Sequence, residues 1–227
     1  MKFTATNGTD MSGNPYFKVV MESAGKTTIR NLSVSQFIEV LGKSTTEERQ
    51  YIQLRDGFFP ETAVSTWFSD YENYSCVWEV PAKVRLLILR TALGDKHFHV
   101  PFPKMLFAIQ VKNGQVTKKA CFAMKKGTDK IFHYPFGNVA STGDICMGNI
   151  STSDMQKVSD FSDAFFSGIT GNDYFGSSGA GKVSVSFSQE QLLEKISTLK
   201  AFPDAFLVED KAHTLKGLCE KFPLNYK

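Results

Sequence analysis

The sequence lacks the features that would place it at a membrane or on a nucleic acid. No stretch approaches the roughly 18 consecutive apolar residues of a membrane-spanning helix. The start, MKFTATNGTDMSGNPYF, is polar and has no apolar signal core. The net charge is +3, but Lys and Arg are scattered and form neither a basic arm nor a stripe, which argues against nucleic-acid binding. We expect a cytoplasmic, globular protein without membrane or nucleic-acid partners.

Cysteine and histidine are both scarce, with four residues of each. The four cysteines lie far apart and no two have CxxC spacing, which favours reduced thiols over a disulfide framework. His97 and His99 flank one residue and would point the same way from a strand, but no nearby Cys or carboxylate cluster completes a zinc site. We therefore expect no metal and no other cofactor. The cysteines are Cys76, Cys121, Cys146 and Cys219.

A glycine-rich segment at 176–187, GSSGAGKVSVSF, has the G-x-x-x-x-G-K spacing of a phosphate-binding loop. Val183 stands where such a loop needs a magnesium-binding Ser or Thr. An alternating strand, rather than the helix that would hold the phosphates, is predicted to follow. The segment therefore predicts a flexible glycine-serine loop.

The chain is long enough for one core with a smaller appended unit, since 42% of its 227 residues are hydrophobic. In the N-terminal part, YFKVVM and KTTIR predict a hairpin that turns at Gly25. Short helices are predicted for 33–42 and from Ser44. We predict an N-terminal extension over 1–55, a core over 56–175 and a C-terminal segment with helices over 176–227.

The predicted core is α+β, an antiparallel β-meander with flanking helices. The segment FFPETAVSTWFSDYEN predicts a proline-broken turn and a short helix. Four strand-like segments follow, SCVWEV, KVRLLILRT, PKMLFAIQV and QVTKKACFAMK, and Asn113-Gly114 between the last two predicts a type I′ turn. Helices are predicted from Ser151 to Gly168, after a Ser188–Gln191 capping box, and over HTLKGLCEKF before Pro223.

One loop carries the features of a reactive site. In FHYPFGNVASTGDICMGN, residues 132–149, Asn138 precedes Cys146 by eight positions, and Gly143 would let the backbone fold back between them. A cysteine thiolate can carry an acyl group, and a neutral amide can stabilise the oxyanion without protonating the thiolate. The pattern is equally that of a turn with a small buried cysteine behind it.

This stretch resembles the active-site region of ubiquitin-conjugating enzymes, in which a His-Pro-Asn turn precedes a glycine and an Ile-Cys pair. Here GN at 137–138, G at 143 and IC at 145–146 keep the asparagine, glycine and cysteine in register. A closer resemblance is to the bacterial PRTRC system protein B family, which is ubiquitin-conjugating-enzyme-like, and it covers roughly residues 55–175. It is carried by FFPETAV, VWEVP, PFPKMLFAI, FHYPFGNV, GDICMGN and FSDAFFSGITGN.

The resemblance implies transfer of a ubiquitin-like protein that a ThiF-like activating protein supplies, with ATP consumed by that partner. Cys146 would carry the thioester and Asn138 would stabilise the oxyanion when an acceptor amine attacks. Phe136 and Gly137 replace the family's His and Pro, so His133 or Tyr134 could take over the bracing of the turn. The acidic residue expected near the site has three candidates, which are Asp144, Asp154 and Asp173.

Two other functions remain open from the sequence. An inactive conjugating-enzyme-like scaffold would bind a ubiquitin-like protein or a ThiF-like activating protein without chemistry at Cys146. A cysteine hydrolase would need a histidine within hydrogen-bond reach of Cys146, and His133 is the histidine that lies close in sequence. The acceptor, whether a protein or a small amine, is left undefined.

Overall fold

The computed structural model describes residues 2–9, 13, 15–23, 26–37, 54–148, 150–152, 155–176 and 181–222. The chain divides into two compact units, Met1–Gln53 and Leu54–Lys227. Among the helices in the described ranges, none has both the length and the apolar character needed to cross a membrane.

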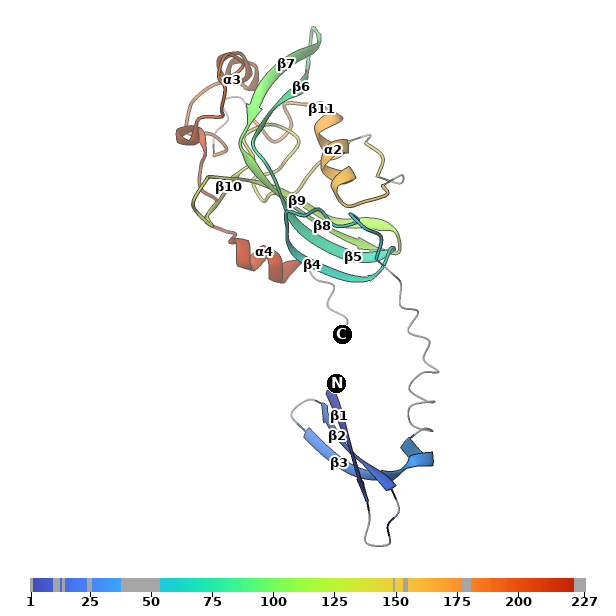
Figure 1. Cartoon of the computed structure of the whole chain (residues 1–227). Helices are drawn as coiled ribbons and strands as arrows, with labels where there is room; N and C mark the ends of the chain where they lie inside the picture. The colour runs from blue at the N-terminus through green and yellow to red at the C-terminus, as the bar shows by residue number, and fades with distance from the viewer. Residues whose placement is uncertain are drawn as a thin grey trace. The chain divides into compact units, whose positions relative to one another are not determined.

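The N-terminal unit is a three-stranded antiparallel sheet in the order β1-β2-β3 (Figure 1). The predicted hairpin is confirmed as β2 and β3, and β1 pairs with the other edge of β2. Residues 34–37 of the predicted first helix are helical; the predicted helix from Ser44 falls outside the described residues. The strands are β1 (Lys2–Thr9), β2 (Pro15–Ser23) and β3 (Lys26–Ser33).

The larger unit is built on a five-stranded antiparallel sheet in the order β10-β9-β8-β5-β4 (Figure 1). The predicted turn between β8 and β9 is confirmed, since Asn113 and Gly114 both have positive φ, 50° and 71°, as a type I′ turn requires. The strands are β4 (Ala63–Asp70), β5 (Asn73–Val80), β8 (Lys104–Lys112), β9 (Gln115–Met124) and β10 (Ile131–His133).

The short helix predicted before Asn73 is wrong, because this segment is strand β4. Its side chains alternate between exposed and partly buried positions, and it pairs with β5 along the edge of the sheet. Thr66, Trp67 and Phe68 are residue types that favour strands over helices. The turn predicted before it is present, with the Ala63 amide donating to the Pro60 carbonyl at 2.9 Å.

The second of the four predicted strands leaves the main sheet. It is β6 (Lys83–Thr91), and it pairs with β7 (Gly94–Phe102), a strand that the sequence did not predict. On its other edge β6 pairs in parallel with the short β11 (Ile169–Thr170). The α+β class is confirmed with mostly antiparallel pairing, and this second sheet, in the order β11-β6-β7, is an addition to the predicted meander.

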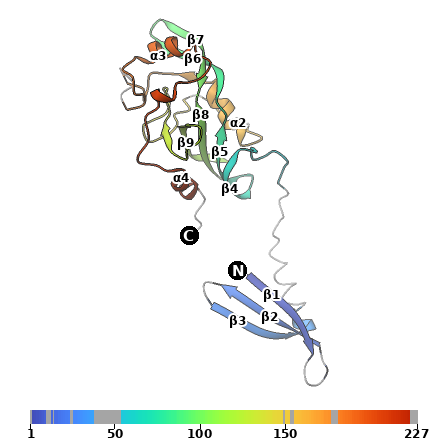
Figure 2. The same ribbon diagram turned by 60° about the vertical axis from the view of Figure 1, so that its left-hand side comes forward.

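Both faces of the main sheet are buried, because successive residues of its central strands enter different clusters. Trp78 and Phe107 pack with Phe161 of α2 (Ser159–Ser167), whereas Val77 and Leu106 pack in the cluster that contains Leu218 of α4 (Leu215–Lys221). Figure 2 shows α2 and α4 at separate parts of this sheet. The buried Gln110 also donates through Nε2 to the Phe222 carbonyl at 2.9 Å, which ties the end of α4 to β8.

The start of α3 was predicted more accurately than the start of α2. The Ser188–Gln191 capping box is confirmed at the start of α3 (Gln189–Ile196), which buries Leu192, Leu193 and Ile196. In contrast, α2 begins at Ser159, well after the predicted Ser151. The strand predicted after Lys182 reduces to one bridge, Val183 with Leu207. A 3-10 helix (Asp204–Phe206) lies between α3 and α4.

Candidate active site

Asn138 and Cys146 meet across a narrow loop. The Cys146 amide donates to the Asn138 carbonyl at 2.7 Å, and Val139 pairs with Ile145 as an antiparallel bridge. The loop then closes through the Gly143 amide, which donates to the Ala140 carbonyl at 2.9 Å. The two candidate residues are therefore neighbours at the open end of a hairpin-like turn.

The far end of this loop rests on strand β9. The Cys121 amide donates to the Gly143 carbonyl at 2.9 Å, which joins the turn to the sheet. Gly143 has a φ of +84°, and a Cβ at this position would lie 2.1 Å from the Phe122 ring. Gly143 is thus required both by its backbone conformation and by the contact beneath it.

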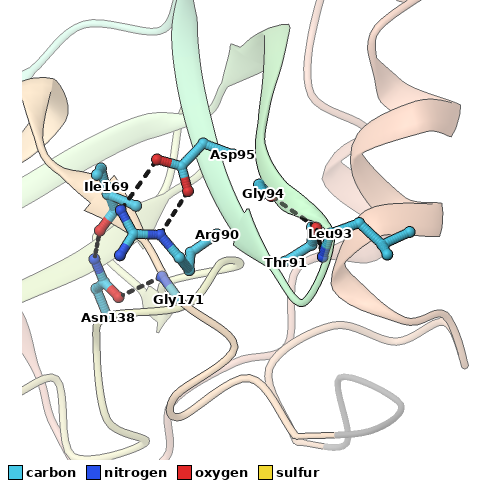
Figure 3. Close-up of polar contacts among 8 residues, drawn as sticks. All are labelled: Arg90, Thr91, Leu93, Gly94, Asp95, Asn138, Ile169 and Gly171. Carbon is cyan, nitrogen blue, oxygen red and sulfur yellow. Dashed lines mark hydrogen bonds and ion pairs between the residues drawn. The ribbon is translucent and has the colours of Figure 1, made fainter.

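The Asn138 side chain fastens the loop to β11 (Figure 3). Its Nδ2 donates to the Ile169 carbonyl at 2.8 Å, and its Oδ1 accepts from the Gly171 amide at 3.0 Å. The carboxamide thereby makes the bonds that a neighbouring strand would make along this edge of β11. Asn138 also has a φ of 65°, a left-handed conformation that asparagine tolerates better than most residues.

A close backbone approach permits this attachment. A Cβ on residue 137 would lie 2.0 Å from the Gly171 carbonyl oxygen, so glycine is the residue that fits there. The same carbonyl accepts from Nε2 of the buried Gln189 at 3.2 Å. Ubiquitin-conjugating enzymes have a proline at this place in their turn. Here a glycine is needed instead, because the backbone at Gly171 lies too close for a larger residue.

Cys146 opens onto a cavity of about 470 Å³ that also contains Asn138, Arg90, Ile169 and Asp173. Arg90 comes from β6 and forms a two-point ion pair with Asp95 of β7, with Nη2 to Oδ2 at 3.0 Å (Figure 3). The sequence carries no local signal for Arg90, because only the pairing of β6 with β11 brings it to Asn138.

Of the three acidic candidates, Asp173 lies in the cavity of Cys146. Its backbone carbonyl also accepts from the Asn138 amide at 3.1 Å. Asp144 instead accepts from the Thr142 hydroxyl at 2.7 Å and lines a different cavity, together with Lys118 and His213. Asp154 falls outside the described residues.

His133 and Tyr134 are placed away from this cavity. His133 Nδ1 is buried and lies 3.8 Å from Oδ2 of Asp210. Tyr134 is buried against the rings of Phe136 and Phe165, and this burial raises the pKa of its hydroxyl well above the ordinary value. Neither side chain is among the residues lining the cavity of Cys146.

The four cysteines differ sharply in exposure. Cys146 is exposed and Cys219 is partly buried. Cys76 and Cys121 are buried, as their positions in apolar strands predict. Burial raises the pKa of Cys76 to about 12 and that of Cys121 well above its ordinary value. Both therefore remain protonated at neutral pH, whereas the Cys146 thiol is accessible.

The described residues contain no group of three or more His, Cys, Asp or Glu side chains placed to hold a metal ion, and His97 and His99 lie exposed on β7. A phosphate-binding loop is followed directly by a helix. In the described residues, no helix begins between Gly181 and Gln189.

Comparison with known proteins identifies the family. The model of prokaryotic E2 family D matches residues 38–209, about three quarters of the chain. The chain belongs to prokaryotic E2 family D. No curated protein and no solved structure matches the chain. Membership of an E2 family indicates a ubiquitin-conjugating-like role, with ubiquitin-like proteins and activating enzymes as the general class of partner.

Alkylation should distinguish the cysteines of this family D protein. With iodoacetamide near pH 8, we expect Cys146 to react first and Cys219 more slowly. Cys76 and Cys121 should react only after unfolding, since both are buried and protonated. Peptide mass spectrometry over time measures each rate. Equal rates at Cys121 and Cys146 in the folded protein would contradict the described burial.

Replacing Gly143 should destabilise the fold more than replacing Gly127. Both glycines have positive φ, +84° and +78°, but a Cβ meets the Phe122 ring at Gly143 and open space at Gly127. We expect Gly127→Ala to lower the free energy of unfolding by ~1 kcal/mol and Gly143→Ala by ~2–4 kcal/mol. Urea denaturation measures both values. Equal losses would show that Phe122 moves aside without cost.

Proposed function

We propose that this protein carries a bacterial ubiquitin-like protein as a thioester on Cys146 and transfers it to an amine. The observation that supports this function best is the exposed Cys146 beside Asn138 in one cavity. The resemblance to PRTRC system protein B adds the ThiF-like activating protein as the partner that supplies the modifier. The protein itself then needs no cofactor, because activation has already consumed ATP.

In the charging step, the Cys146 thiolate attacks the carbonyl carbon of the modifier's thioester on the activating protein. A new C–S bond forms to Cys146, the bond to the activating protein's thiol breaks, and that thiolate takes a proton from water. Cys146 is suited to this step because its side chain is exposed on the cavity. The other three cysteines are wholly or partly buried.

In the transfer step, an amine attacks the thioester carbonyl and the oxygen becomes negative. Asn138 Nδ2 has a second hydrogen besides the one donated to Ile169, and this hydrogen is the donor we assign to the oxyanion. The Asp173 carboxylate, in the same cavity, takes the proton that the amine loses. Collapse of the intermediate releases the Cys146 thiolate and leaves an amide.

A scaffold without chemistry is the second candidate, and one observation favours it. Both polar atoms of the Asn138 carboxamide already bond to backbone groups, the Ile169 carbonyl in β11 and the Gly171 amide just after it, so the residue has a structural use without catalysis. A hydrolase has less support, since no histidine is among the described residues that line the cavity of Cys146.

Charging should depend on Cys146. We expect a thiol-labile adduct when the protein is mixed with ATP, a ThiF-like activating protein and a ubiquitin-like protein of the kind that the resemblance implies. The adduct should be absent in Cys146→Ala and become thiol-stable in Cys146→Ser, because serine forms an oxygen ester. Intact mass under non-reducing conditions measures it, and Cys219→Ser serves as the matched control. If the activating protein is demonstrably charged and no adduct forms on this protein, the thioester function is contradicted and the scaffold function remains.

Transfer should depend on Asn138 after charging. We expect Asn138→Ala and Asn138→Asp to form the thioester within about twofold of the wild-type rate but to discharge to free lysine ~100-fold more slowly. The aspartate variant keeps the acceptor for the Gly171 amide, whereas the alanine variant loses both bonds to the backbone, and neither variant can donate to the oxyanion or to the Ile169 carbonyl. Discharge at the wild-type rate in Asn138→Asp would contradict the oxyanion role.

A further inference from the structure

A buried lysine supports the loop from beneath. Lys182 is 2% exposed, and its Nζ donates to the Phe136 carbonyl at 2.7 Å and also to the Val139 carbonyl. These two carbonyls stand on either side of Gly137 and Asn138. The ammonium therefore joins the two ends of the turn that presents the Asn138 carboxamide.

Burial of the Lys182 ammonium is unfavourable, so its hydrogen bonds to the two carbonyls must offset the cost of removing the charge from water. Desolvation lowers the pKa of Lys182 to about 8, which leaves it predominantly protonated at neutral pH. A buried ammonium needs hydrogen-bond acceptors, and buried carbonyls need donors. Methionine would fill a similar volume without charge, but it would leave the Phe136 and Val139 carbonyls without this donor.

The surroundings give Lys182 no access to substrate. Its Nζ lies 6.0 Å from the centroid of the Tyr134 ring, within the buried region beneath the loop. Lys182 is not among the residues lining the cavity that contains Cys146. The amine is thus neither an acceptor for the modifier nor a group that touches the reacting atoms, and any effect on transfer must pass through the loop.

We propose that Lys182 is a positioning residue for transfer: its bonds to the carbonyls of Phe136 and Val139 fix the left-handed turn at Asn138. This rests on the proposed function of Asn138 and Cys146. The turn lacks the bracing histidine of ubiquitin-conjugating enzymes, since Phe136 takes its place and is buried against Phe102 and Phe202. Lys182 supplies the bracing bonds from another segment of the chain.

The test compares charging and discharge in Lys182→Met, Lys182→Gln and the exposed control Lys126→Met. We expect charging within about twofold of wild type in all three. Single-turnover discharge to lysine should fall by about 10- to 100-fold in Lys182→Met, because a small displacement of a catalytic group has effects of this size. Lys182→Gln, which retains a donor, should lose less. Only folded protein is charged, so the discharge rate constant does not depend on the folded fraction.

A double-mutant cycle separates positioning from general stability. If Lys182 acts through Asn138, then Lys182→Met should slow discharge little further in an Asn138→Ala background. Amide hydrogen exchange at Cys146, which donates to the Asn138 carbonyl, should be faster in Lys182→Met than in wild type. Wild-type discharge rates in both Lys182 variants, or additive losses in the cycle, would overturn the proposal.

The two proposals fail in different ways. If the wild-type protein is never charged, the thioester function fails, and discharge cannot be measured. If the wild type is charged and discharges through Asn138 while the Lys182 variants match it, the thioester function stands and the positioning role is wrong.

Discussion

The candidate site depends on how closely two backbone segments approach one another at Gly137 and Gly171. A single Cβ at residue 137 would lie 2.0 Å from the Gly171 carbonyl oxygen, so the approach exists only because glycine occupies that position. It lets the Asn138 carboxamide reach β11 and places Arg90 and Asp173 around the same cavity. The arrangement of the residues around Cys146 thus depends on a steric condition one residue before Asn138.

The sequence predicted correctly those elements that a few neighbouring residues specify. The Ser188–Gln191 capping box and the Asn113-Gly114 turn are complete within four residues, and both are present in the structure. The candidate pair Asn138 and Cys146 was also found locally, since one short loop contains both residues. The bond between their backbones shows that the spacing of eight residues corresponds to a real turn.

What the sequence did not show depends on partners far along the chain. Strand β4 was predicted as a helix although several of its residue types favour strands, because the short segment does not reveal its pairing with β5. Lys182 was assigned to a flexible loop, yet its acceptors lie 43 and 46 residues earlier. Arg90 reaches the cavity through the parallel pairing of β6 with β11, a contact that no local pattern records.

The attachment of Asn138 to β11 also affects how the protein behaves towards other copies of itself. An exposed strand edge offers free amide and carbonyl groups to any passing extended chain and so favours aggregation. Here the carboxamide occupies the Ile169 carbonyl and the Gly171 amide, which are the groups that such a chain would use. The carboxamide and the loop backbone at Gly137, which lies against the Gly171 carbonyl, therefore leave no room at this edge for a strand from another copy.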